Sequence, residues 1–311
     1  MIGKEILIVA KKSCQFPARQ HLDATMIIMK KILLIFISWL TLFLFLPTVQ
    51  AIAEEGTLHL SLYPYLAASK LVKNFSPLVS YLSQAIGQPV ELELENDYKQ
   101  HIHHMGNEEV DIAFMGPISY LQMTAEFGTK PILACFEIDG KPTYRGVIAV
   151  RKGTPLHDLS SLKGKRFAFG ANDSTMGHYV ALFMMKQAKI DLASLGSYES
   201  IENQENIALG VLMGDFDAGA MREAVFNAYE KEGLQALATS DPIPEHLFVG
   251  ATHLGMEKAL KLAKAMYALK DSEEGKSILA ALQKKLTALI PATDLDYQEL
   301  RTIYHTVEKH E

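Results

Sequence analysis

Residues 110–120 read VDIAFMGPISY, and the fold class can be argued outward from them. The first six residues form a short, mainly apolar run of the kind that makes a buried β-strand. Gly116 and Pro117 follow at once, and proline suits the first turn of a helix, where its missing N–H leaves no hydrogen bond unmade. A buried strand that passes directly into a helix is the repeating unit of an α/β protein.

The same alternation continues on both sides of this stretch. Residues 70–86 show helical spacing of apolar residues, and Gly87 with Pro89 beyond it provides a helix stop. Strands are expected at residues 58–62, 90–94, 110–115, 131–137, 146–150, 166–169, 217–220 and 247–251. Further helices are expected at residues 177–188 and 207–213, from 222 onward, and at 256–269, 272–289 and 297–308. This order predicts an α/β fold with mainly parallel sheets, helices on both faces and a helical C-terminal tail.

Two lobes are expected, because 311 residues are too many for one ordinary core. The strand and helix pattern restarts after a polar segment that begins at Arg151. We therefore assign residues 54–150 plus 246–311 to lobe 1 and residues 151–245 to lobe 2, so that the chain crosses between the lobes twice. A cleft between two such lobes is suited to closing on a small ligand.

The N-terminal region carries a targeting pattern. Residues 32–46 hold no charge, a pair of lysines precedes them, and small residues follow. This pattern predicts a signal peptide at residues 29–53 and a periplasmic protein. An uncleaved membrane anchor is the alternative, although a spanning helix needs ~20 apolar residues. Since Met26 and Met29 stand just before the lysines, residues 1–28 are interpreted as a gene-model extension.

Composition excludes several classes of protein. Lys and Arg total 30 against 36 Asp and Glu, and the net charge of −6 comes without a basic block, so no nucleic-acid partner is expected. Two cysteines, Cys14 and Cys135, rule out a disulfide scaffold and a four-cysteine zinc site. His101, His103 and His104 have no carboxylate following at metal-ligand spacing, so they are assigned to a solvated helix face and no metal is expected.

The sequence also lacks the short motifs of common enzymes. It contains no G-x-S-x-G, no H-E-x-x-H, no P-loop and no dinucleotide fingerprint. Cys135 lies in an apolar run and is expected to be buried and unreactive. The protein is therefore not expected to be an enzyme or to hold a cofactor.

A candidate oxyanion site follows the strand at residues 166–169. Ser174 and Thr175 offer hydroxyl groups, and Gly177 and His178 open the next helix, whose free N–H groups favour an anion. The alternative is that the two hydroxyl residues only cap the helix.

Three further residues are candidates for ligand binding. Tyr120 offers a phenol in the helix that starts at Pro117, or packs on that helix. Asp217 begins a strand, where it could read a protonated group or simply hold a turn. Tyr63 and Tyr65 follow the first strand, at the edge where open α/β sheets bind ligands, and one of them is expected only to pack.

Taken in order, these segments resemble the periplasmic phosphate/phosphite/phosphonate-binding proteins of ABC transporters, from about Thr57 to about Leu286. The matching segments are residues 75–82, 87–90, 111–120, 144–148, 162–165, 174–177 and 214–220. The resemblance implies a type II periplasmic-binding-protein fold, an anion held between the lobes and delivery to a permease in the inner membrane. It also implies a protein without enzymatic activity, and a monomer is expected.

The resemblance implies ligand-binding roles for Tyr120, for Ser174 with Thr175, and for Asp217. Two departures bear on the ligand. Met176 stands where the family often has a second serine, and Gln204 stands where it often has a histidine. Glutamine is neutral at every pH and supplies no cation. A different oxyanion, or a neutral or zwitterionic solute, therefore stays open, as does a periplasmic sensor that signals to a membrane partner.

Overall fold

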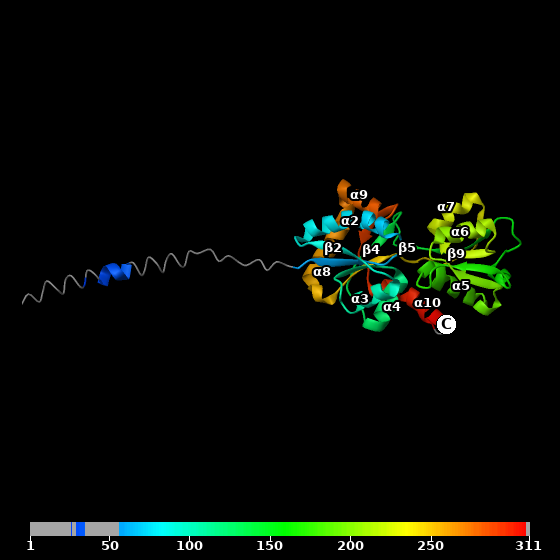
Figure 1. The fold of residues 1–311 in the computed structure, drawn as a ribbon, viewed down its shortest axis with the longest axis horizontal. Helices are drawn as coiled ribbons and strands as arrows, with labels where there is room; N and C mark the ends of the chain where they lie inside the picture. The colour runs from blue at the N-terminus through cyan, green and yellow to red at the C-terminus, as the bar shows by residue number, and fades with distance from the viewer. Residues whose placement is uncertain (1–25, 27–28, 35–55, 309–311) are drawn as a thin grey trace, which may run out of the picture. The chain divides into compact units, whose positions relative to one another are not determined.

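The computed structural model describes Met26, residues 29–34 and residues 56–308 (Figure 1). The chain divides into two units, Met1–Glu54 and Glu55–Glu311. In the first unit Met29–Leu34 is helical, and the rest of the predicted signal peptide and of residues 1–28 lies outside the described residues. Among the residues described, none of the helices has the length and apolar character needed to cross a membrane.

The first lobe is built on a six-stranded mixed sheet with the order β13-β4-β12-β3-β1-β2. Its strands are β1 (Leu58–Leu62), β2 (Val90–Leu94), β3 (Ile112–Met115), β4 (Ile132–Ile138), β12 (Leu247–Gly250) and β13 (Leu286–Ile290). One apolar core joins the sheet to α2 (Ala68–Ile86), α8 (Gly255–Ala268) and α9 (Glu273–Leu282). A second core joins its other face to α3 (Tyr98–Gly106) and α4 (Pro117–Phe127).

The second lobe is built on a five-stranded mixed sheet with the order β10-β6-β9-β7-β8. Its strands are β6 (Gly146–Arg151), β7 (Arg166–Phe169), β8 (Ser197–Ser200), β9 (Ala218–Arg222) and β10 (Leu234–Thr239). α6 (Gln204–Met213) and α7 (Glu223–Tyr229) cover one face. A wide helical turn at Thr175–Val180, continued by α5 (Ala181–Gln187), covers the other.

A two-stranded antiparallel ribbon connects the lobes. It pairs β5 (Thr143–Tyr144) with β11 (Ile243–Pro244), and Figure 1 shows β5 between the two sheets. The last helix, α10 (Gln298–Glu308), also reaches the second lobe. There Tyr179 Oη donates to a carboxylate oxygen of Glu308 over 2.7 Å, and Lys186 Nζ donates to the Thr306 carbonyl over 3.0 Å.

Three features differ from the sequence-based expectation. The sheets are mixed, because strands that enter from the other lobe, such as β12 and β6, run antiparallel to their neighbours. β6 lies in the second sheet, so the lobes divide at the β5–β11 ribbon and not after Val150. The helix expected at residues 272–289 ends at Leu282, and Leu286–Ile290 instead pairs with β4 as β13.

The histidines of α3 are not all on a solvated face. His101 is 0% exposed, and its ring lies 2.8 Å from Ser61 Oγ and 3.0 Å from the Phe114 carbonyl. Ser61 in turn donates to the buried carboxylate of Glu95, which also meets His104 Nδ1 at 3.1 Å. Burial lowers the pKa of His101 to about 4, so the ring is held neutral.

This burial predicts a pH-dependent loss of stability. Between pH 6.5 and about 4 the unfolded chain protonates His101 and the folded chain does not, so the free energy of unfolding falls as the pH falls. The window corresponds to a loss on the order of 3 kcal/mol. Denaturant unfolding across this range should show a shallower pH slope in His101→Gln. His103→Gln, a partly exposed histidine on the same helix, is the control and should keep the wild-type slope.

Candidate functional site

The start of α4 forms the first wall of the candidate site. A Cβ atom on Gly116 would lie 3.8 Å from Ser119 Oγ, 3.8 Å from Tyr63 Oη and 3.9 Å from His246 Nε2. Three polar groups from different parts of the first lobe therefore converge on Gly116, which has no side chain to fill the space between them. The positive end of the helix dipole lies at the same place, and it favours an anion.

Ser119 is the most informative of these residues. It is 1% exposed, and its hydroxyl has no hydrogen-bond partner among residues 56–308. A buried hydroxyl without a partner costs free energy, and proteins rarely keep one without a use for it. It lies in the first turn of α4, beside Tyr63 and His246, where its hydroxyl could donate to a bound group.

Thr175 brings the second lobe to the same helix end. Its Oγ1 accepts a hydrogen bond from the Ile118 N–H over 3.2 Å, so one lobe satisfies a free donor of a helix in the other. Ser174 Oγ accepts from the Gly177 N–H over 3.1 Å and thereby caps its own helix. Gly177 is needed for close packing, because a Cβ there would lie 2.8 Å from the Gly170 Cα.

Tyr63 belongs to a cluster of four tyrosines beside this helix end. The ring centroid of Tyr63 lies 4.8 Å from that of Tyr65 and 4.7 Å from that of Tyr98, and Tyr144 joins them from the ribbon. Burial raises the pKa of all four phenols, and the positive charge of Arg222 acts against this. Their hydroxyl groups are therefore protonated at neutral pH and can donate to an anion.

Gln204 and Arg222 complete the wall of the second lobe. Gln204 Nε2 donates to Ser174 Oγ over 3.3 Å, and its Oε1 accepts from the Arg222 N–H over 2.9 Å. Since β9 runs parallel to β7, Arg222 at its carboxyl end lies on the sheet edge from which Ser174 follows. The residues predicted from sequence did not include Arg222, Ser119, Tyr98, Tyr144 and His246. Their one sequence signal is that several come just after strands.

Two predicted ligand-binding residues have other partners. Tyr120 is 0% exposed, and its hydroxyl donates to Asp294 Oδ1 over 2.8 Å while its ring packs on Tyr297. Asp217 accepts from the Arg166 backbone N–H over 2.9 Å and from its guanidinium over 3.0 Å. Because Arg166 starts β7, this pair lies at the amino edge of the sheet, opposite the edge that carries Ser174.

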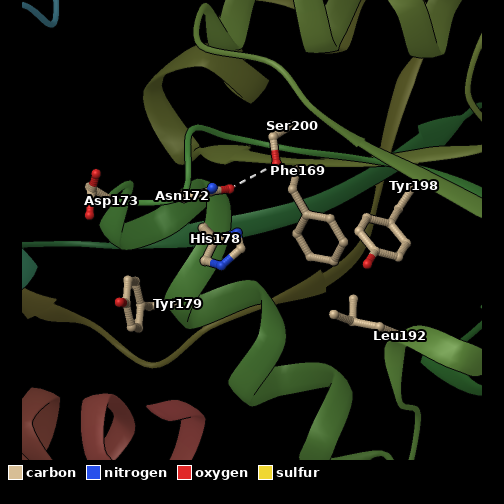
Figure 2. A pocket seen from close by; sticks show the side chains of 8 residues that line it. All are labelled: Phe169, Asn172, Asp173, His178, Tyr179, Leu192, Tyr198 and Ser200. Atoms are coloured by element: carbon tan, nitrogen blue, oxygen red, sulfur yellow. Dashed lines mark hydrogen bonds between the residues drawn. The ribbon is translucent and has the colours of Figure 1, made fainter. Parts of the chain in front are cut away.

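His178 lines a separate pocket of about 390 Å³ within the second lobe (Figure 2). The pocket lies beside the strand-to-helix turn that precedes Ser174, and its aromatic wall includes Phe169 and Tyr198. His178 packs edge-on against Phe169. The structure therefore turns His178 toward this pocket and leaves Tyr63 and Thr175 at the start of α4.

A different group could hold a cation. Ligand atoms of Glu93, Glu95 and His104 lie within 4.8 Å of one another on the first lobe. Glu95 and His104 already bond each other at 3.1 Å, which by itself accounts for their closeness.

The site at the start of α4 is suited to binding an oxyanion. It combines hydroxyl donors from both lobes, a helix N-terminus and one cation. The nearby carboxylate of Glu245 contacts His246 Nδ1 at 3.0 Å. Such donors fix the orientation of a small anion.

Known proteins similar to this chain include binding proteins for phosphorus oxyanions. The profile described as "ABC transporter, phosphonate, periplasmic substrate-binding protein" matches residues 60–297. The phosphate-import protein PhnD of Mycolicibacterium smegmatis is 26% identical over 283 residues, covering 82% of this chain and 88% of that protein.

Solved structures confirm the two-lobed α/β fold. XAC2383 from Xanthomonas citri, bound to ATP, has a TM-score of 0.72 at 17% identity, over 82% of this chain and 99% of that one. PhnD1 from Prochlorococcus marinus, in complex with methylphosphonate, has a TM-score of 0.70 at 20% identity, over 81% of this chain and 98% of that one.

The placement of Tyr120 predicts a role in stability. Tyr120→Phe should lower the free energy of unfolding by about 1 kcal/mol, since it removes one buried hydrogen bond while Arg301 still pairs with Asp294. Ligand affinity should stay within twofold of wild type. Urea unfolding and calorimetric titration check both values, and a large loss of affinity with unchanged stability would return Tyr120 to the ligand site.

Proposed function

Because the chain belongs to the phosphonate ABC transporter periplasmic substrate-binding protein family, we propose that it captures a small phosphonate- or phosphite-like oxyanion between its lobes and delivers it to an ABC permease. The family consists of non-enzymatic binding components, so the protein is a substrate-binding component of a transporter. The proposal includes export through the predicted signal peptide at residues 29–53, in keeping with a periplasmic family.

The observation that carries the proposal is the unpartnered hydroxyl of Ser119 at the start of α4. Hydroxyl groups from both lobes lie around the start of α4, with Tyr63 from the first lobe and Thr175, which accepts from the Ile118 N–H, from the second. A phosphonate or phosphite presents several oxygen acceptors on one centre, which suits donors that converge from different directions. Ser174 and Gly177 would act by holding the turn that presents Thr175.

Ligand capture would follow from a hinge at the β5–β11 ribbon. The ribbon holds two residues on each strand, so few backbone bonds resist rotation of one lobe against the other. The hydrogen bond from Ile118 to Thr175 would form on closing and would break on opening. A bound oxyanion would favour the closed arrangement, because it contacts both lobes at once.

The double variant Ser174→Ala/Thr175→Ala tests the second wall. Its affinity for methylphosphonate, phosphite or phosphate should fall tenfold or more, because Thr175 contacts the site and Ser174 shapes its turn. The fold should survive, as judged by circular dichroism. Ser197→Ala, an exposed serine on β8, is the control and should bind as wild type does. Unchanged affinity in the double variant would place the ligand elsewhere.

Ser119→Ala gives a sharper test, because two effects should have opposite signs. Removing the unpartnered hydroxyl should raise the stability of the ligand-free protein by about 1 kcal/mol. It should also weaken oxyanion binding about tenfold, since a donor is lost. Thermal unfolding with and without methylphosphonate measures both effects. A variant that is more stable yet binds methylphosphonate unchanged would remove Ser119 from the site.

A further inference from the structure

We infer that Arg222 selects the charge of the ligand, so that the site takes doubly ionised oxyanions and rejects singly charged ones of the same shape. This inference rests on the proposed function and names the substrate class of the same site. Three observations support it. In the described part of the chain, the guanidinium of Arg222 lacks the hydrogen bonds that the other arginines make, Arg222 lies at the end of β9, and its charge acts on the tyrosines near the site.

The guanidinium of Arg222 differs from those of the other arginines described. Within residues 56–308 it makes no hydrogen bond and no ion pair, although the residue is partly buried. The four other arginines in that range each donate to a carbonyl or carboxylate oxygen, namely Arg145, Arg151, Arg166 and Arg301. A partly buried guanidinium without such a partner is available for an anion that enters the site.

The backbone of Arg222 is nevertheless hydrogen-bonded to Gln204, in the wall that the second lobe contributes to the site. Its N–H donates to Gln204 Oε1, and Gln204 Nε2 donates to Ser174 Oγ, so one side chain links Arg222 to the Ser174-Thr175 turn. The residue also ends β9 and precedes the first residue of α7. The fold thus fixes the backbone of Arg222 beside the Ser174-Thr175 turn.

The charge of Arg222 acts across the boundary between the lobes. It lies on the second lobe, yet it acts on the phenols of Tyr63, Tyr65 and Tyr98 of the first lobe and on Tyr144 of the ribbon. Tyr63 Oη is one of the groups that converge on Gly116 beside Ser119. A ligand held at the start of α4 would therefore lie in the field of this cation.

The remaining charges near the site do not replace Arg222. Asp173 and Glu202 act on Tyr98, and Glu245 acts on Tyr144, so all three would repel an anion. The carboxylate of Glu245 is paired with His246. Uncharged hydroxyl donors respond less to the second negative charge of an oxyanion than a cation does. The guanidinium gains more from the second charge, and this difference is the basis of selection.

Methylphosphonate and methanesulfonate test the inference, because they have the same shape and differ by one charge once the phosphonate is fully ionised. Calorimetric titration of the purified protein should show at least about tenfold tighter binding of methylphosphonate, the size of one charge-assisted hydrogen bond. The preference should grow as the pH rises through the second ionisation of the phosphonate.

Three variants complete the experiment. Arg222→Gln should lose the preference for methylphosphonate and its dependence on pH, while Arg222→Lys should keep part of both. The thermal midpoint of ligand-free Arg222→Gln should match wild type, because the guanidinium has no partner to lose. Arg166→Gln makes the same chemical change at the opposite sheet edge and should keep the wild-type preference.

The outcomes separate this inference from the proposed function. If wild type binds methylphosphonate and Arg222→Gln keeps its preference over methanesulfonate, the role of Arg222 is wrong and the transport function stands. If wild type binds both ligands equally, selection by charge is likewise wrong. If wild type binds neither these ligands nor phosphate or phosphite, both the inference and the proposed function fail.

Discussion

The free N–H groups at the start of α4 are the constraint on which the arrangement of the lobes depends. A helix cannot satisfy its own first donors, so partners must come from outside it. Here one partner is the Thr175 hydroxyl of the other lobe, which accepts from Ile118. The same helix end carries Ser119, whose hydroxyl has no partner among residues 56–308. One helix terminus therefore bonds to the other lobe and also carries a buried hydroxyl that is available for the proposed anion.

Two connections join the lobes, and both would respond to a movement of one lobe against the other. The β5–β11 ribbon is short, and Tyr144 on it faces the same cluster as Tyr63 and Arg222. α10 adds a second connection, because it packs on the first lobe and bonds Tyr179 and Lys186 of the second. Rotation about the ribbon would therefore change contacts of α10 together with those of the ligand wall.

Sequence patterns predicted those strands and helices that depend on neighbouring residues in the chain. The strand at residues 110–115 and the helix after it follow from local apolar spacing and from the Gly-Pro step. β13 was missed because the apolar run of residues 286–290 suits a helix or a strand equally, and only pairing with β4 decides. In the site, adjacent residues on one helix point in different directions. Ser119 faces the cluster and Tyr120 faces Asp294, which spacing alone does not indicate. Arg222 was missed because its importance comes from strand order in the second sheet.

The tyrosine cluster gives the protein an optical property. Residues 56–308 contain no tryptophan, since the single tryptophan of the sequence is Trp39, and all twelve tyrosines fall within that range. Four of them, Tyr63, Tyr65, Tyr98 and Tyr144, cluster beside the start of α4 and come from both the first lobe and the ribbon. Movement of the lobes would change the distances between these rings, and with them how strongly the rings quench one another. The tyrosine emission of the folded region would therefore report the proposed closing of the lobes without an attached dye.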